Sequence, residues 1–252
     1  MITDPLFYAA AIPAVVLLGL AKGGFSGLGL LSLPLMALVL SPVQAAAITL
    51  PILIVQDAVT VWAYRRTWDR RNVLILLPSA VLGIVTGYLV AAQVSDATVT
   101  LAVGLIAVAF AVRRMVLERR ATPPQAARAD LPRGLFWGWV AGFTSMIAHA
   151  GGPPFQIYVM PQKLPRDVFV GTGAVFFAVN NWIKVPPYIA LGQFSAGNLA
   201  TAAALFPIAI ASTWAGVHLV RRVSGEKFYT LVYILLVVVG AKLVIDGAMT
   251  LL

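Results

Sequence analysis

Two glycine-rich breaks, the second of which also contains two prolines, interrupt long apolar runs, and they constrain the fold more than any other feature of the chain. The first break is residues 21–29 (AKGGFSGLG) and the second is residues 148–154 (AHAGGPP). Glycine frees the backbone and proline removes an amide donor, so a helix does not pass through either break undisturbed. In hydrocarbon, unwound backbone is tolerated only where protein buries it or where it lines a water-filled cavity. The two breaks are therefore predicted to lie inside the protein.

The composition is that of a membrane protein. Of the 252 residues, 60% are hydrophobic and 11% are charged, whereas a soluble domain has about 25% charged residues. The apolar runs are long and continuous, which favours helices over the alternating segments of a membrane barrel. The formal net charge is +9, but the arginines lie in short loops between apolar runs, a pattern typical of membrane topology rather than of nucleic-acid binding. The absence of cysteine excludes disulfides and thiolate-ligated metals.

The hydropathy pattern predicts an all-α polytopic membrane protein with about 8–10 membrane segments in two halves. Residues 1–112 form the first transmembrane repeat and residues 134–252 the second. They are joined by a cytoplasmic linker, residues 113–133, which contains six arginines. Whether the interrupted segments 5–40 and 134–160 are full spans or re-entrant hairpins is left open at this point. The expected segments are 5–40, 44–64, 72–92, 97–112, 134–160, 167–191, 199–220 and 228–252.

Corresponding loops of the two halves differ in charge, which predicts an inverted repeat. The basic loop 65–71 corresponds to the neutral loop 192–198, and the neutral turns 41–43 and 93–96 correspond to the basic segments 163–166 and 221–227. Positively charged loops stay on the cytoplasmic side, so the two halves have opposite orientations. Segment 134–160 then enters and leaves on one side, with its break at the tip. Both termini are expected outside, and the broken helices are expected to meet near the membrane midplane.

A few polar groups within the apolar runs are candidates for function, because a charge in the membrane costs several kcal/mol unless it is paired or hydrated. Each also has a structural alternative: Lys22 can snorkel from a helix end, His149 can pack between helices, and Asn180 and Asn181 can bond neighbouring helices. Asp57 lies mid-span and is a candidate proton carrier or partner of Lys184. The predicted substrate-binding residues are Lys22, Gly23, Gly24, Ser26, His149, Gly151, Gly152, Gln156, Asn180, Asn181 and Lys184, and the predicted coupling residues are Asp57 and His149.

These features favour a transporter over an enzyme. Ser26 lies in a GFSG sequence that lacks the strand–turn–helix context of a nucleophile elbow, and the two histidines are too far apart to form a metal site. No ATPase motif, cofactor motif or catalytic residue is identified. Paired broken segments are typical of secondary transporters that work by alternating access. The alternatives are an anion channel or uniporter and, less favoured, a membrane-embedded enzyme.

Several motifs resemble those of the TauE/SafE sulfite exporter family: residues 21–29 with Pro34, residues 64–69 (YRRTWD) and residues 148–156 (AHAGGPPFQ). The resemblance implies two repeated halves that move sulfite or organosulfonate anions across the bacterial inner membrane, with the basic loops cytoplasmic. It implies a small anion and the lipid bilayer as partners, with protons and a second copy of the chain as further candidates and no nucleic acid. Family members commonly have a triple glycine where this chain has residues 29–31 (GLL), so the resemblance leaves the particular anion open.

Overall fold

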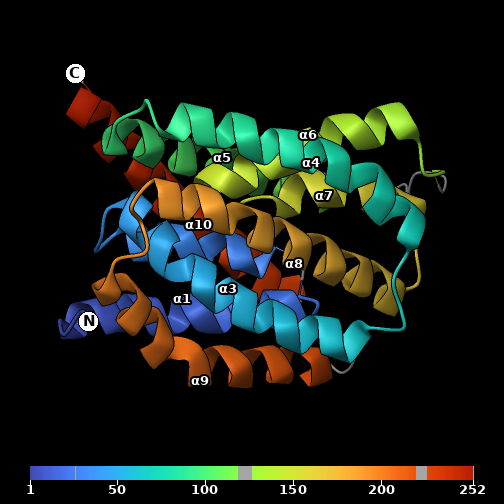
Figure 1. Ribbon diagram of the computed structural model, residues 1–252, viewed down its shortest axis with the longest axis horizontal. Helices are drawn as coiled ribbons and strands as arrows, with labels where there is room; N and C mark the ends of the chain where they lie inside the picture. Colours follow the sequence, from blue (N-terminus) through green and yellow to red (C-terminus); the bar gives the residue numbers. More distant parts are fainter. Residues whose placement is uncertain (26, 119–126, 220–225, 252) are drawn as a thin grey trace.

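A computed structural model describes residues 1–25, 27–118, 127–219 and 226–251, and within these ranges the chain is helical and contains no strand (Figure 1). Seven of the described helices are long and apolar enough to cross a membrane, which confirms the prediction of an all-α polytopic membrane protein. The helices are α1 (Pro5–Gly23), α2 (Ser32–Ala37), α3 (Pro42–Tyr64), α4 (Arg70–Ala91), α5 (Asp96–Glu118), α6 (Leu131–Ala148), α7 (Gly152–Val159), α8 (Arg166–Ala190), α9 (Ala196–Leu219) and α10 (Glu226–Leu251), with the short 3₁₀ helices η1 (Leu28–Leu31) and η2 (Met160–Gln162).

Local capping signals place the starts of several helices. Asp4, Ser41, Asp69 and Asp130 precede α1, α3, α4 and α6, and each side chain accepts a hydrogen bond from a backbone amide in the first turn. Such caps satisfy amides that have no partner within the helix. A proline follows the cap in α1, α3 and α6, at a position where its missing N–H is not needed. These starts lie within a few residues of the predicted boundaries.

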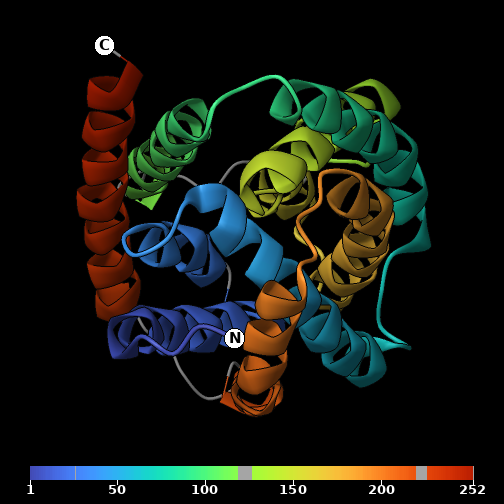
Figure 2. The same cartoon turned by 60° about the vertical axis from the view of Figure 1, so that its left-hand side comes forward.

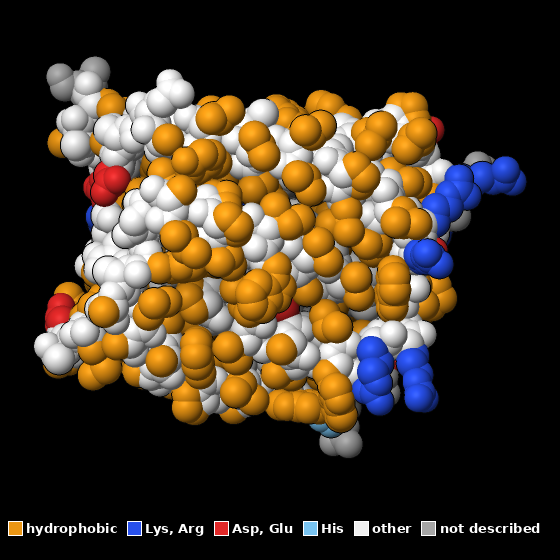
Figure 3. Space-filling model, in the orientation of Figure 1, with side chains coloured by type: hydrophobic (Ala, Val, Ile, Leu, Met, Phe, Trp, Pro, Cys, Tyr) orange, Lys and Arg blue, Asp and Glu red, His pale blue; other side chains and the backbone are white. Residues whose placement is uncertain are grey.

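The two ends of the molecule differ in charge. Both termini lie at the left-hand end in Figure 1, called here the terminal end. Lysine and arginine side chains gather at the opposite end (Figure 3), called here the basic end. On the face shown in Figure 3, the side chains between the two ends are mostly hydrophobic, as a lipid-facing surface requires. The exposed basic residues of segments 65–71, 128–133 and 163–166 are Arg65, Arg66, Arg70, Arg71, Arg128, Arg133, Lys163 and Arg166.

Both interrupted segments fold back on themselves. Helix α6 leads inward from the basic end, and α7 returns to it, where the Tyr158 hydroxyl donates to the Asp130 carbonyl at 3.0 Å. The returning arm α7 has 8 residues and so rises only about 12 Å, less than half of a hydrocarbon core of about 30 Å. Segment 134–160 therefore has the re-entrant form, with the break at its tip. The first segment runs from the terminal end through α1 and returns through η1 and α2 (Figure 1).

The helix packing pairs the two halves. Helix α1 packs on α9 as α6 packs on α4, and α3 packs on α9 as α8 packs on α4. The remaining main pairs, α3 with α8 and α5 with α10, join counterparts to each other. Figure 2 shows α5 and α10 side by side at one edge and α4, α6 and α8 on the other side. An inverted repeat requires such a correspondence. The repeat itself, and the division at residues 112 and 133, remain predictions.

Glycine permits the close approach of α4 and α6, and replacing Gly142 by alanine is expected to destabilise the protein. A Cβ atom on Gly142 would lie 2.0 Å from the Ala80 carbonyl oxygen, so the helices must separate at a cost of about 1–3 kcal/mol. Thermal unfolding in detergent measures the effect. Gly197→Ala is the matched control, since the nearest atom to its Cβ would lie 3.8 Å away. Equal melting temperatures for the two variants would contradict this contact.

Candidate functional site

Each break ends a helix through a left-handed backbone conformation. After α1, Gly24 has φ 131° and Gly27 has φ 95°, conformations that glycine adopts without steric cost. After α6, the residue in this conformation is His149, with φ 50°, which is uncommon for a residue with a side chain. Its amide donates to the Ser145 carbonyl at 3.1 Å. Such backbone strain persists where surrounding contacts hold the residue in place, and the contacts of His149 are specific.

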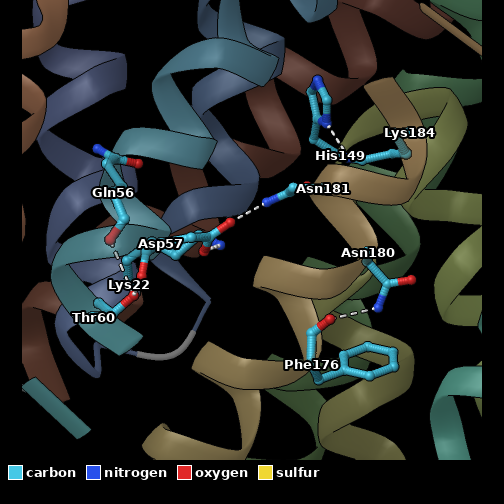
Figure 4. Close-up of polar contacts among 9 residues, drawn as sticks. All are labelled: Lys22, Gln56, Asp57, Thr60, His149, Phe176, Asn180, Asn181 and Lys184. Carbon is cyan, nitrogen blue, oxygen red and sulfur yellow. Dashed lines mark hydrogen bonds and ion pairs between the residues drawn. The ribbon is translucent and has the colours of Figure 1, made fainter. Parts of the chain in front are cut away.

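One polar cluster joins the first break to α3 and α8. Lys22 forms an ion pair with Asp57, and the other carboxylate oxygen accepts a hydrogen bond of 2.5 Å from the Asn181 amide (Figure 4). The Lys22 ammonium also lies 5.2 Å from the centre of the Phe177 ring, a cation–π distance. The side chain of Lys22 is 12% exposed and that of Asp57 is 2% exposed. The charge of Lys22 is therefore balanced inside the protein, and the snorkelling alternative does not apply.

A second cluster joins the second break to α8. Lys184 is fully buried, and its ammonium lies 2.8 Å from His149 Nδ1 and 3.2 Å from the Ser145 carbonyl oxygen. His149 Nε2 lies 2.9 Å from the Ala46 carbonyl oxygen. A carbonyl only accepts, so Nε2 carries the hydrogen and Nδ1 accepts from Lys184. Among the residues that the structure describes, no carboxylate forms an ion pair with Lys184. A buried cation without a counter-charge is costly, which makes Lys184 a natural partner for an anion.

A cavity of about 130 Å³ lies between the two clusters; we call it the central cavity. Both lysines face it, and most of the remaining wall is apolar. A few convergent polar groups in an otherwise apolar concavity are typical of small-molecule sites. The cavity is lined by Leu18, Ala21, Lys22, Gly24, Gly27, Gly29, Leu30, Leu53, Ser145, His149, Gly152, Phe155, Gln156, Phe169, Val170, Gly173, Ala174, Phe177, Asn181 and Lys184.

Most of the residues predicted for the site line this cavity, and Asp57 lies directly behind Lys22. Gly23, Gly151 and Asn180 do not line it. Gly23 packs against α9, and Asn180 donates to the Phe176 carbonyl of its own helix at 2.8 Å (Figure 4). Ser26 lies outside the described residues. The predicted residues that line the cavity are Lys22, Gly24, His149, Gly152, Gln156, Asn181 and Lys184.

The aromatic part of the wall is absent from the sequence-based prediction. Phe155, Phe169 and Phe177 face the cavity from α7 and α8. Along α8 the lining positions are 169, 170, 173, 174, 177, 181 and 184, a single helical stripe. Phe177 lies one helical turn before the predicted site residue Asn181, so extending the prediction by one turn toward the start of α8 would have identified it. Within the described ranges, no group of three or more His, Cys, Asp or Glu side chains is placed to hold a metal ion.

The fold and the site define a multi-span membrane protein with a cationic cavity between two broken helices, an arrangement typical of membrane transporters of small solutes. The chain belongs to the TauE/SafE sulfite exporter family, whose model, described as "Sulfite exporter TauE/SafE", matches residues 11–243. This confirms the resemblance seen in the motifs. Membership is consistent with transport of a small anion within a lipid bilayer and with a function other than catalysis. Neither a curated protein nor a solved structure matches the chain.

Proposed function

We propose that the protein is a secondary transporter that moves sulfite or an organosulfonate across the bacterial inner membrane by alternating access. The observation that carries the proposal is Lys184: a fully buried cation that lines the central cavity without a carboxylate partner among the described residues. Two of its three N–H groups are used by Ser145 and His149. The third is left for an oxyanion, which supplies the missing charge.

The charges of the site favour a singly charged anion. Lys22 and Lys184 contribute two positive charges and Asp57 one negative charge, with His149 neutral in the tautomer inferred above, so one negative charge balances the cluster. The amide of Gln156 faces the same cavity and adds a donor for an oxygen. The apolar wall near Phe177 suits a hydrocarbon group. An organosulfonate, with one charge and an apolar substituent, therefore fits the cavity better than bare sulfite does.

The proposal includes orientation and coupling. The basic end faces the cytoplasm, as positively charged loops do, and both termini face outward. Protons are the proposed coupling ion, carried by Asp57 or His149. Proton uptake by Asp57 would break its ion pair with Lys22. Proton uptake by His149 would break its hydrogen bond with Lys184. A homodimer is part of the proposal as well, and mass measurement in detergent tests it.

Proteoliposomes that contain the purified protein are expected to take up sulfite and sulfonates with saturation, and faster when a pH gradient is imposed. Benzenesulfonate is expected to compete more strongly than methanesulfonate, because its ring contacts the aromatic wall. Liposomes without protein are the control. Flux that does not saturate and never exceeds equilibrium would replace the carrier by a channel or uniporter. No flux of either anion class would overturn the proposal.

A further inference from the structure

A second cavity, of about 190 Å³, lies beyond the first toward the terminal end; we call it the terminal cavity. Its wall includes the starts of α3 and α5 and the ends of α4 and α8. Asp96 is the only charged group among the described residues that line it, and no lysine, arginine or histidine does so. The terminal cavity therefore lacks the groups that would hold an anion in place. It has the character of a passage rather than of a second binding site.

Helices α3, α6 and α8 line both cavities, and α3 and α8 do so in succession. Along α8, Lys184 faces the central cavity, whereas Tyr188, one turn further, faces the terminal cavity. On α3, Leu53 lines the central cavity and Ala46 the terminal cavity. Helix α6 lines the two cavities from different faces, with Ser145 toward the central cavity and Met146 toward the terminal cavity. The two cavities therefore follow one another along a common axis.

A single layer of side chains and backbone separates them. His149 reaches across from the second break, and its Nε2 lies 2.9 Å from the Ala46 carbonyl oxygen. The Tyr188 ring stacks on the His149 ring, with centroids 6.0 Å apart and planes inclined by 26°. The Tyr188 hydroxyl donates to the Met146 carbonyl at 3.3 Å, and the Phe194 ring lies beside the Tyr188 ring, with centroids 6.0 Å apart. The layer joins α3, α6 and α8, so a relative movement of these helices would open it.

We propose that the terminal cavity is the outer half of the substrate path and that the His149–Tyr188 layer is the gate between it and the central cavity. In this structure the gate is closed. The inference rests on the proposed function for the identity of the solute, but the gate itself can be tested without any solute.

Anion binding and the gate both depend on the ammonium nitrogen of Lys184. The Lys184 ammonium donates to His149 Nδ1, and an oxyanion in the central cavity binds the third N–H of the same ammonium. The bound anion draws the ammonium toward the central cavity and lengthens its hydrogen bond to His149, which then depends more on its bond to the Ala46 carbonyl, and the layer is held more weakly. A ligand shifts an equilibrium by its different affinity for the two states. Occupancy of the anion site therefore favours opening toward the terminal end.

The chain has no cysteine, so a single introduced cysteine reports access to one cavity without background. Ala174→Cys places the thiol in the central cavity and Val94→Cys places it in the terminal cavity. A membrane-impermeant cationic methanethiosulfonate is added to one side of oriented vesicles, without any substrate. With the gate closed, the Val94→Cys variant is expected to react only from the side of the termini, and Ala174→Cys is expected not to react from that side.

Adding Tyr188→Ala to Ala174→Cys is expected to speed labelling from the side of the termini by at least about tenfold, whereas Tyr188→Phe, which keeps the ring, changes it by less than about threefold. Fast labelling of Ala174→Cys from that side with Tyr188 intact, or no acceleration by Tyr188→Ala in a folded protein, would overturn the gate. If Tyr188→Ala does not fold, Val94→Cys still decides: failure to react from the side of the termini rules out the path. If the cysteines label as expected but no anion flux is found, the proposed function is overturned and the proposed gate still stands.

Discussion

Replacing Lys184 by methionine is expected to lower sulfonate uptake by about 100-fold, because a charge-assisted hydrogen bond to an anion is worth about 1.5–3 kcal/mol and each 1.4 kcal/mol is a factor of ten. Methionine has a similar length and leaves no buried charge. A buried ion replaced by an apolar side chain is often neutral or stabilising. The variant is therefore expected to remain folded, and the loss of transport reports the anion contact. Initial rates and apparent affinity in proteoliposomes measure the effect.

Lys242→Met is the matched control. Lys242 is exposed and pairs with Asp246 at 2.5 Å, four residues along the same helix, so its loss is expected to leave uptake unchanged. A Lys184→Met protein with normal rate and affinity would remove Lys184 from the substrate site. A variant that fails to fold would instead assign Lys184 a structural role, and the melting temperature separates these outcomes.

Replacing Asp57 by asparagine is expected to reduce the free energy of unfolding by about 3–5 kcal/mol, since it leaves the buried charge of Lys22 without its partner. Both carboxylate oxygens are used, one by Lys22 and one by Asn181. Adding Lys22→Met to Asp57→Asn removes the unpaired charge and is expected to recover most of the lost stability. Chemical or thermal unfolding in detergent measures each protein of this double-mutant cycle.

Asp246→Asn provides the comparison with an exposed ion pair, which contributes no more than about 0.5 kcal/mol. Equal effects of Asp57→Asn and Asp246→Asn would contradict the buried pair. If Asp57 also carries the coupling proton, the double variant is expected to transport without responding to a pH gradient. A response equal to that of the unmodified protein would move the coupling role to His149.

The helical segments and the general position of the site could be predicted from the sequence. Helix starts follow from local caps such as Asp69 and Asp130, and the loop charges predict that segment 134–160 enters and leaves at one end. Sequence alone could not separate neighbours on a helix. Asn180 and Asn181 point about 100° apart around the helix axis. Asn180 therefore bonds the backbone of its own helix, whereas Asn181 bonds Asp57.

The partners of the charged groups depend on tertiary packing. The sequence-based alternative that Asp57 pairs with Lys184 is wrong: Lys22 lies in the first break and Asp57 on α3, and only the way α1 lies against α3 and α8 decides that Asp57 pairs with Lys22. The contact between His149 and the Ala46 carbonyl uses a backbone atom, which has no signature in the side-chain pattern. The aromatic wall is likewise a property of how α7 meets α8.

The two cavities in series also determine where a membrane voltage acts. If each cavity fills with water, most of the electrical potential falls across the thin layer at His149 and Tyr188 rather than across the full thickness of the bilayer. Moving one elementary charge through 100 mV changes its energy by about 2.3 kcal/mol. An anion that steps past this layer would therefore cross nearly the whole field within one residue's length, and voltage would act directly on that step.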